Sequence, residues 1–413
     1  MNLFAAMRSP RHVVFGRGQR AAVAGYAREI GNRALICTDE RLGSSRELSE
    51  LVDSLAVAGI ESLVFDRTLA EVPLSTIERG VALGKPFGPD MVIGLGGGSC
   101  IDMAKVAALM LTHGGSVRDY FGEFKVPGAV LPVIAVPTTA GTGSEATPVA
   151  VVSDSERTLK VGIASPYLIP HAAICDPELT YSAPSGLAAV AGADALVHAI
   201  EAYTAARRDP TPGLTQEHVS VGKNALSDSH ALLAIAHLGR SLERAVKNEG
   251  DHDARDSVMF GALMAGLAFG TAGVSAAHAI QYPVGAATRT AHGAGVACVL
   301  PFAMEYNLPA ATHEMARVAD ALGLPATEGG DRERAHAAID AVTRLFGAIG
   351  IPKNLRVLGL HEDKLEWTAE QSLGAARLIK NNPRPLDLPA MRVIVGAAFS
   401  GDRAGLRQRM QAE

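Results

Sequence analysis

Two side chains of the metal-ligand type lie four positions apart in the second half of the chain. Asp194 and His198 belong to the segment GADALVHAIEAYTA, which has no glycine or proline after its first residue. A helix places residues four apart on one face, so both side chains point to the same place. Two further histidines, His278 and His292, follow in SAAHAIQYPVGAATRTAHGAGVACVLP. One carboxylate oxygen and three imidazoles suit a divalent transition metal with open positions for a substrate oxygen, and zinc and ferrous iron both fit.

The sequence around His278 supports a shared metal. A single buried histidine is more often a hydrogen-bonded core residue than a ligand. His278, however, lies in a stretch from Val258 to Thr288 that contains no Asp, Glu, Lys or Arg. The stretch is long enough to span a bilayer, but its glycines and the residues His278, Gln281 and Pro283 favour a buried central helix of a globular protein. We therefore expect the protein to have no membrane span.

The first half of the chain carries a pattern typical of phosphate binding. In MVIGLGGGSCIDMAKVAALML an apolar run leads into three glycines and then into a helical stretch. The glycines let the backbone approach an anion, and we expect Ser99 and Asp102 to form a capping box at the helix N-terminus. The pattern predicts a pyrophosphate site; a tight strand–helix turn without a ligand is the alternative.

Two further features favour a dinucleotide. The loop PTTAGTGSEAT, residues 137–147, places five hydroxyl side chains directly after an apolar run, which is more than a simple turn requires. Asp39 ends the run RALICTDE. In dinucleotide folds an acid at this place accepts hydrogen bonds from the adenosine ribose and repels a 2′-phosphate, which favours NAD over NADP. An ordinary turn aspartate is the alternative.

The elements that would position these residues fall into two types. Short apolar runs alternate with helical stretches in the first half, which predicts a parallel sheet with crossover helices. The predicted strands are residues 33–40, 62–68, 90–98 and 131–139, and the predicted helices between them are residues 47–59 and 74–88. After Ser185 the chain changes to long alanine-rich helices without a clear strand. We place the domain boundary near residues 180–187, where Pro184 and Gly186 suit a linker.

Composition excludes some functions. The 413 residues include 38 Lys and Arg against 43 Asp and Glu, a net charge of −5, with no basic run that would bind nucleic acid. The cysteines lie far apart without CxxC pairing or a secretory leader, which predicts reduced thiols in a cytoplasmic protein. They are Cys37, Cys100, Cys175 and Cys298.

Taken together, the motifs resemble those of the iron-dependent (group III) alcohol dehydrogenases over nearly the whole chain. The motifs occur in the family's order: GGGSCIDMAK, PTTAGTGSE, DPELT, GADALVHAIEAYTA, AHAIQYPVGA, HGAGVACVLP and NPRPL. The resemblance implies an α/β plus all-α fold, related to dehydroquinate synthase. A Rossmann-like parallel-sheet NAD-binding domain, residues 1–185, would precede an all-helical metal-binding and substrate domain, residues 186–413.

The resemblance also implies site residues. The metal ligands would be Asp194, His198, His278 and His292. The cofactor contacts would be Gly97, Gly98, Ser99, Asp102, Thr138, Thr139, Thr142, Val151, Lys160 and Leu179, with Asp39 at the adenosine ribose. The implied cofactors are NAD(H) and a divalent metal, Fe²⁺ ahead of Zn²⁺, and the implied assembly is a homodimer or a larger homo-oligomer.

One position departs from the family pattern. Many members carry a second histidine four positions beyond the ligand that corresponds to His278, and this chain has Tyr282 there. Its hydroxyl would either join a proton relay or pack against the cofactor. We name Tyr282 and His292 as catalytic candidates. In this family a tyrosine also occurs here in the branch that acts on hydroxyacids, so the resemblance makes a compound similar to 4-hydroxybutyrate a candidate substrate, but no more than a candidate.

The expected function is a metal-dependent hydride transfer between NAD(H) and a primary alcohol or aldehyde, or a small hydroxyacid or oxoacid, with the metal polarising the substrate oxygen. The alternatives are a dehydroquinate-synthase-like lyase, a metal hydrolase, or an NAD-binding regulatory protein with a structural metal. The lyase would need several Lys and Arg near the metal motifs, where they are scarce. Residues 204–228 should contribute to the substrate site, and Arg207, Arg208 and Lys223 there would either bind an acidic substrate or lie on the surface in solvent.

Overall fold

The computed structural model describes residues 3–157, 160–326 and 329–412. These residues form two compact units. The α/β unit comprises residues Arg8–Ser182 and Gln216–Val219, and the helical unit contains most of the remaining chain from Ala183 onward. Each unit has its own layers and core.

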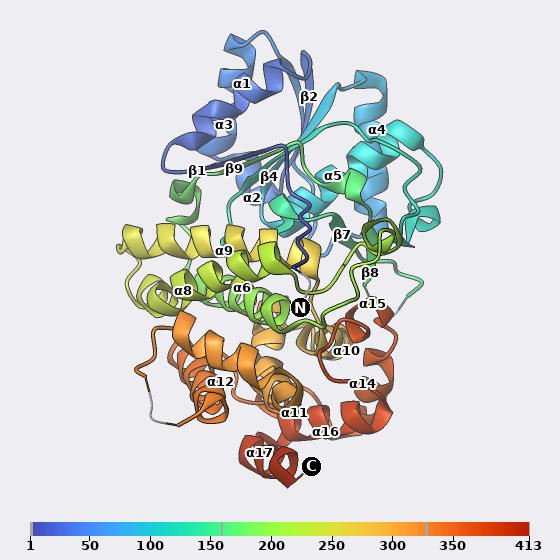
Figure 1. Cartoon of the computed structure of the whole chain (residues 1–413). Coiled ribbons are helices and arrows are strands. Elements are labelled where there is room, and N and C mark those ends of the chain that lie inside the picture. Colours follow the sequence, from blue (N-terminus) through green and yellow to red (C-terminus); the bar gives the residue numbers. More distant parts are fainter. Residues whose placement is uncertain (1–2, 158–159, 327–328, 413) are drawn as a thin grey trace. The chain divides into compact units, whose positions relative to one another are not determined.

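A six-stranded, all-parallel sheet forms the centre of the α/β unit (Figure 1). Its spatial order is β1 (His12–Phe15), β9 (Ala172–Cys175), β6 (Val133–Pro137), β4 (Met91–Gly96), β2 (Arg33–Cys37) and β3 (Glu61–Phe65). The four strands predicted from the sequence, β2, β3, β4 and β6, are confirmed. The strands β1 and β9 were not predicted, because each has only four residues and periodicity is a weak signal at that length.

Helices cover both faces of this sheet. They are α1 (Val23–Arg28), α2 (Glu40–Gly43), α3 (Arg46–Val57), α4 (Leu74–Phe87) and α5 (Gly98–His113). Successive residues of a strand point to opposite faces. Ala34 and Ile36 accordingly join the apolar cluster with α1 and α3, while Leu35 and Cys37 join the cluster with α4 and α5. This two-faced burial explains why the central strands are continuous apolar runs.

A second, smaller sheet lies in the same unit and was not predicted. It consists of β5 (Gly122–Glu123), β8 (Val161–Ala164) and β7 (Val149–Val152). β7 and β8 pair antiparallel, and β7 follows the hydroxyl-rich loop. The strands are too short to give a clear alternation, so only their pairing identifies them.

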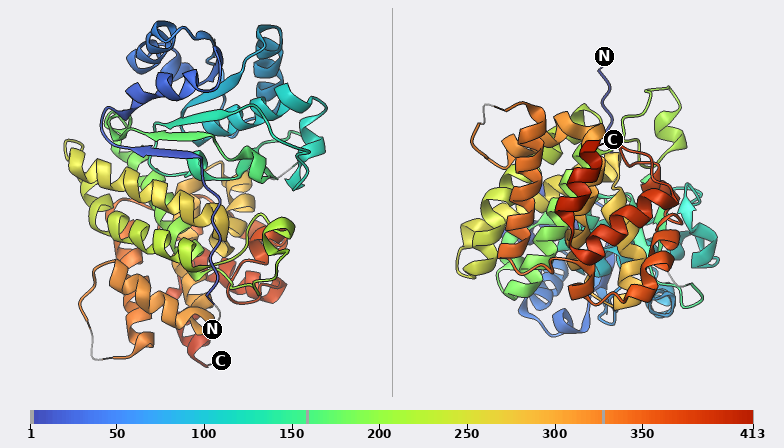
Figure 2. Two further views of the ribbon diagram at one scale, coloured as in Figure 1. Left: turned by 45° about the horizontal axis from the view of Figure 1, so that its top comes forward. Right: turned by 90° about the horizontal axis from the view of Figure 1, so that it is seen from below.

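The helical unit is a set of packed helices without a strand among its described residues (Figure 2). Its longer helices are α6 (Ser185–Thr204), α8 (Ala225–Lys247), α9 (His252–Ala272), α10 (Ala276–Thr288), α11 (His292–Ala321), α12 (Asp331–Ala348), α14 (Leu365–Ser372), α16 (Leu388–Ser400) and α17 (Arg403–Ala412). Its short helices are α13 (Leu355–Leu358) and α15 (Ala376–Ile379), while α7 (Leu214–Glu217) is divided between the two units. Helix α6 packs against α8, α9 and α11, so it is the central element.

The uncharged stretch 258–288 is buried as expected, but it is not one helix. It contains the end of α9 and all of α10, which meet at a bend of 102°. Gly273 ends α9 with φ of 86°, a conformation that glycine adopts without strain. Among the described helices none alone is long and apolar enough to cross a membrane. Helices α9 and α10 meet the criterion of length and composition only when they are taken together.

Candidate metal centre

The central helix α6 carries the first two candidate ligands. It begins at Ser185 after Pro184 and consists largely of alanine and other good helix formers. Asp194 and His198 are both buried on this helix, and the spacing of four residues places them on one face, as predicted.

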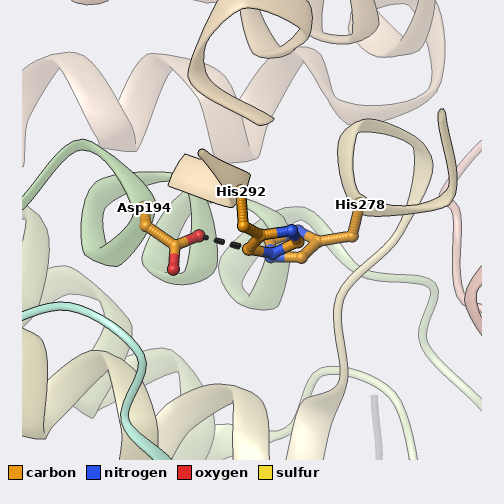
Figure 3. A group of neighbouring side chains, drawn as sticks. All are labelled: Asp194, His278 and His292. Atoms are coloured by element: carbon orange, nitrogen blue, oxygen red, sulfur yellow. Dashed lines mark ion pairs between the residues drawn. The ribbon is translucent and has the colours of Figure 1, made fainter. Parts of the chain in front are cut away.

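The other two candidate ligands come from two further helices. His278 lies in the first turn of α10, and His292 is the first residue of α11. The Oδ1 atom of Asp194 lies 3.8 Å from Nε2 of His198, 3.7 Å from Nε2 of His278 and 3.9 Å from Nε2 of His292. Figure 3 shows Asp194, His278 and His292 converging on one point from their three helices. The tertiary structure therefore brings together all four residues that the sequence singled out.

The arrangement fits a divalent cation. Oδ1 of Asp194 and Nε2 of His278 are buried and have no hydrogen-bond partner among the described residues. Leaving a buried acceptor unpaired costs about 1–3 kcal/mol. Ligand atoms of one metal ion lie about 3–3.5 Å apart, slightly closer than the 3.7–3.9 Å between Oδ1 of Asp194 and the three imidazoles. The ligand atoms of Asp194, His278 and His292 all lie within 4.8 Å of one another, and His198 is not part of that group. A bound cation would therefore satisfy the buried atoms of Asp194 and His278, while His198 would have to approach the other ligands.

The electrostatics of the cluster also favour a positive charge. Burial by itself would raise the pKa of the Asp194 carboxyl, but the imidazoles of His198, His292 and His278 hold that pKa well below its usual value. Burial would lower the pKa of His278, but the carboxylates of Asp194 and Glu201 raise it to about 9. The metal-free cluster thus takes up protons, which a metal ion would displace on binding.

Glu201 is a site residue that the sequence analysis missed. It lies on α6 one turn beyond His198, and its Oε2 atom is 2.7 Å from Nδ1 of His278. The signal was present in the sequence, because Asp194, His198 and Glu201 follow the i, i+4, i+7 spacing of one helix face. A second carboxylate on the ligand-bearing face of a buried helix needs a partner.

An aromatic stack fixes the ring of His198. The centroid of the Phe269 ring lies 4.1 Å from that of the His198 ring, at an interplanar angle of 10°. The His278 ring lies 4.6 Å from the His198 ring, at an interplanar angle of 24°. Offset stacking of this kind restricts the rotation of an imidazole. The three groups are all held by helix packing rather than by mobile loops.

The candidate cofactor residues gather at one edge of the parallel sheet in the α/β unit. Strands β6 and β4 end just before Thr138 and Gly97, and the neighbouring strand β2 ends two residues before Asp39. Strand β3 lies on one side of β2 and the next strand, β4, on the other, so the strand order reverses here. Open parallel sheets bind ligands outside the carboxyl ends of the strands at such a point.

The glycine turn and the hydroxyl-rich loop are in direct contact. A Cβ atom added to Gly98 would lie 2.8 Å from Cγ2 of Thr142, so only glycine allows this approach. Thr138 donates its backbone N–H to the carbonyl oxygen of Gly96 at 2.9 Å. Its Oγ1 is buried and has no hydrogen-bond partner among the described residues, which fits a hydroxyl that contacts a ligand.

Comparison with known proteins identifies the family of the chain. The model of the iron-containing alcohol dehydrogenase family matches residues 10–177, and the model of the family's C-terminal domain matches residues 188–399. The chain belongs to the iron-containing alcohol dehydrogenases. A relative, long-chain-alcohol dehydrogenase 1 of Geobacillus thermodenitrificans, is 37% identical over 370 residues, which cover 89% of each chain.

Solved structures show the same fold. A crystal structure of 1,3-propanediol oxidoreductase superposes with a TM-score of 0.89 at 31% identity, covering 96% of this chain and all of that one. Sulfoacetaldehyde reductase from Bifidobacterium kashiwanohense, solved with NAD⁺, has a TM-score of 0.82 at 26% identity, covering 97% of this chain and 99% of that one. The predicted fold, an α/β dinucleotide domain with an all-helical domain, is confirmed.

Family membership identifies the protein as an enzyme. It is an alcohol dehydrogenase whose cofactors are NAD(H) and iron. The lyase and the regulatory NAD-binding protein, which the sequence left as alternatives, are not favoured.

The predicted capping box of this dehydrogenase is wrong. Helix α5 begins at Gly98 with Gly97 as its N-cap, and no side chain caps it. Ser99 therefore lies inside the first turn, and its Oγ accepts the backbone N–H of Glu71 at 3.2 Å. The tight turn starts the helix earlier than the Ser99 and Asp102 pattern suggests.

Asp102 instead holds the hydroxyl-rich loop and the small sheet. Its Oδ1 accepts the hydroxyl of Ser144 at 2.5 Å, and its Oδ2 accepts the backbone N–H of Val151 at 2.9 Å. Lys105, one turn along α5 and fully buried, donates to Ser144 and to the carbonyl oxygen of Val149. These long-range bonds fix the shape of the loop beside the glycine turn.

The remaining predicted cofactor positions lie around the same edge. Asp39 is the N-cap of α2, and its Oδ1 accepts the backbone N–H of Leu42 at 2.9 Å. Lys160 forms an ion pair of 2.8 Å with Glu71, a residue that the sequence analysis missed. Thr139 borders the glycine turn, and Leu179 is buried in a short 3-10 helix after β9.

The basic residues proposed for an acidic substrate have partners of their own. Lys223 is only 7% exposed, and its Nζ lies 3.1 Å from Asp228 and 3.2 Å from Glu314. Arg207 also lies 3.7 Å from Asp228. Lys223 is therefore neither a solvated surface charge nor a free anion-binding group, because neighbouring carboxylates compensate its burial.

Proposed function

We propose that residues 186–413 bind the metal through Asp194, His198, His278 and His292, and that residues 1–185 bind NAD(H) at the carboxyl edge of the parallel sheet. The observation that carries the proposal is the convergence of three imidazole nitrogens on one buried carboxylate oxygen, each within 3.9 Å. One carboxylate and three neutral imidazoles would leave a divalent ion with a net positive charge.

When bound, ferrous iron or zinc supplies a Lewis acid that polarises the substrate oxygen. The protein supplies the orientation. Asp194 and His198 come from one rigid helix, and the side chain of His292 is 33% exposed, more than the other candidate ligands. We propose that the substrate approaches the metal from the side of His292, because the side chains of the other candidate ligands are at most 7% exposed.

We assign a primary alcohol and the corresponding aldehyde as substrates. The relatives above are named for long-chain alcohols, 1,3-propanediol and sulfoacetaldehyde, which share a terminal alcohol or aldehyde group. A small hydroxyacid, suggested by Tyr282, stays the second candidate. The engagement of Lys223 by Asp228 and Glu314 favours the uncharged alcohol.

The substrate assignment is tested by activity. Metal-free protein is reconstituted separately with ferrous iron and zinc, and absorbance at the NADH band is followed with a panel of alcohols, aldehydes and hydroxyacids. We expect turnover with terminal alcohols and aldehydes. Turnover with hydroxyacids alone would reject the uncharged substrate, and no turnover with any member of the panel would reject the assignment.

Asp39 should set the choice of cofactor. Its carboxylate would meet the 2′-phosphate of NADP with like-charge repulsion, so we expect NAD(H) to be preferred by about tenfold or more. Asp39→Asn keeps an N-cap side chain for Leu42 but removes the charge, and it should narrow this preference. The preference is measured as kcat/KM with NADH divided by kcat/KM with NADPH.

Glu40→Gln is the matched control for Asp39→Asn. It removes one negative charge at the next position, where Glu40 is exposed and paired with Arg67 at 2.8 Å. We expect its cofactor ratio to stay at the wild-type value. A wild-type enzyme that prefers NADPH, or equal changes in the two variants, would refute the role of Asp39.

Tyr282 should be dispensable for metal binding. It lies on α10 one turn beyond His278, so its side chain is on the same side of that helix. Tyr282→Phe should keep the metal and NAD(H). If the hydroxyl serves the proton relay, turnover should fall by about tenfold or more, since positioned general acids contribute about 10²–10⁴; if Tyr282 only packs, turnover should change by less than about threefold. Loss of metal from this variant would contradict both roles.

We also propose a cytoplasmic enzyme that forms a homodimer or a larger homo-oligomer. The thiols support a reducing compartment, since Cys37, Cys100, Cys175 and Cys298 are all unpaired and buried. Light scattering after gel filtration measures the oligomeric state.

A further inference from the structure

We infer that Glu201 is a positioning residue that orients His278 toward the metal and fixes the start of the helix that carries it. The inference rests on the proposed ligand role of His278. Glu201 is 2% exposed and lies on α6, the same helix as Asp194 and His198. It would act through His278 and would not contact the metal itself.

The carboxylate of Glu201 accepts four hydrogen bonds from one short segment. Its Oε2 accepts the backbone N–H of Ser275 at 2.9 Å and lies 2.7 Å from Nδ1 of His278. Its Oε1 accepts the backbone N–H of Ala277 at 2.7 Å and the hydroxyl of Ser275 at 3.1 Å. Both oxygens are thus fully used by donors from residues 275–278.

These contacts explain how a helix can begin at a buried bend. The first backbone N–H groups of a helix have no carbonyl partner inside it. Ser275 is the N-cap of α10, but its side chain does not cap the helix. Glu201 supplies the missing acceptor from a neighbouring helix, and its negative charge is favourable at a helix N-terminus. The bend between α9 and α10 is therefore held in place by α6.

The same contacts select the nitrogen of His278 that faces the ligand cluster. A carboxylate that accepts backbone N–H groups on both oxygens is an acceptor, so Nδ1 of His278 carries the hydrogen. Once a metal ion has displaced the proton of Nε2, the lone pair of this nitrogen is available on the side of Asp194, whose Oδ1 atom is 3.7 Å away. A carboxylate behind a histidine ligand fixes its tautomer and raises its basicity as a ligand.

Glu201→Gln tests the inference with little change in shape. A glutamine would have to turn its NH₂ group toward one pair of donors, so at least one backbone N–H or Nδ1 would lose its acceptor. We expect the affinity of the metal-free protein for Zn²⁺, measured by competition with a chelating dye, to fall about 10- to 100-fold. Iron content after reconstitution should fall in parallel.

Glu305→Gln is the matched control. Glu305 is a buried carboxylate of the same unit, 1% exposed, that accepts from Arg403 and Arg407 at 2.7 Å and contacts no candidate ligand. We expect both variants to unfold at a lower temperature than wild type, but only Glu201→Gln to lose affinity for Zn²⁺. Equal affinity in Glu201→Gln and wild type, within about threefold, would overturn the positioning role.

A third variant separates this inference from the ligand assignment. If His278→Ala loses Zn²⁺ while Glu201→Gln retains it, His278 is a ligand and only the positioning role fails. If His278→Ala keeps full affinity, the ligand assignment itself fails.

A measurement on the wild-type protein tests the orientation of His278 even if Glu201→Gln does not fold. In the zinc-loaded protein with ¹⁵N-labelled histidine, nuclear magnetic resonance should show His278 with a hydrogen on Nδ1 and zinc on Nε2. Zinc on Nδ1, or a hydrogen on Nε2, would overturn the inference.

Discussion

His278→Ala should abolish turnover and lower the affinity for ferrous iron by more than about 100-fold, because even the loss of an outer partner of a ligand costs about 10- to 100-fold. The variant removes one of three nitrogens around Oδ1 of Asp194 and leaves Glu201 without its imidazole partner. Metal analysis after reconstitution and steady-state kinetics measure the effect. NAD(H) binding, followed by fluorescence titration, should persist, because the candidate cofactor residues belong to the α/β unit.

His237→Ala is the control for this variant. His237 is a partly buried histidine of α8 whose Nδ1 lies 3.0 Å from the hydroxyl of Ser257, and it is not part of the ligand cluster. It should keep both iron and turnover. If His278→Ala retained full metal and full rate, the four-ligand assignment would be wrong.

Gly98→Ala should weaken NAD(H) binding about 5- to 150-fold, the equivalent of the roughly 1–3 kcal/mol that overpacking costs. The new Cβ would lie 2.8 Å from Cγ2 and 3.0 Å from Cβ of Thr142, so the glycine turn and the hydroxyl-rich loop must separate. Both segments are proposed to contact the cofactor. The dissociation constant for NADH measures the loss, and metal content should not change.

Gly25→Ala is the control for Gly98→Ala. A Cβ at Gly25, inside α1 of the same unit, would meet no atom within 4 Å. Alanine is a better helix former than glycine, so this variant should be as stable as wild type or slightly more stable, with unchanged NADH affinity. Wild-type affinity in Gly98→Ala would show that the turn does not form the cofactor site.

The features that depend on local pattern could be predicted from the amino-acid sequence alone. The apolar runs at residues 33–40 and 90–98 became the central strands β2 and β4, because strands buried on both faces are apolar throughout. The spacing of Asp194 and His198 required one helix face, and the single uncharged stretch around His278 required burial. Residue type and spacing singled out the four candidate ligands, whose side chains the structure brings together around Oδ1 of Asp194.

The partner of each buried polar group could not be predicted from the sequence, because it depends on the packing of distant elements. Ser99 and Asp102 match a capping box in sequence, yet they bond Glu71 and Val151, which are distant along the chain. From the sequence alone Lys223 could be a surface charge, but the structure places it beside Glu314, which is 91 residues away along the chain. Glu201 accepts the backbone N–H groups of Ser275 and Ala277 only because the fold packs the start of α10 against α6. Helical and strand periodicity arise from neighbours in the chain, whereas a buried polar group is stabilised by whichever donor or acceptor the packing of distant elements brings to it.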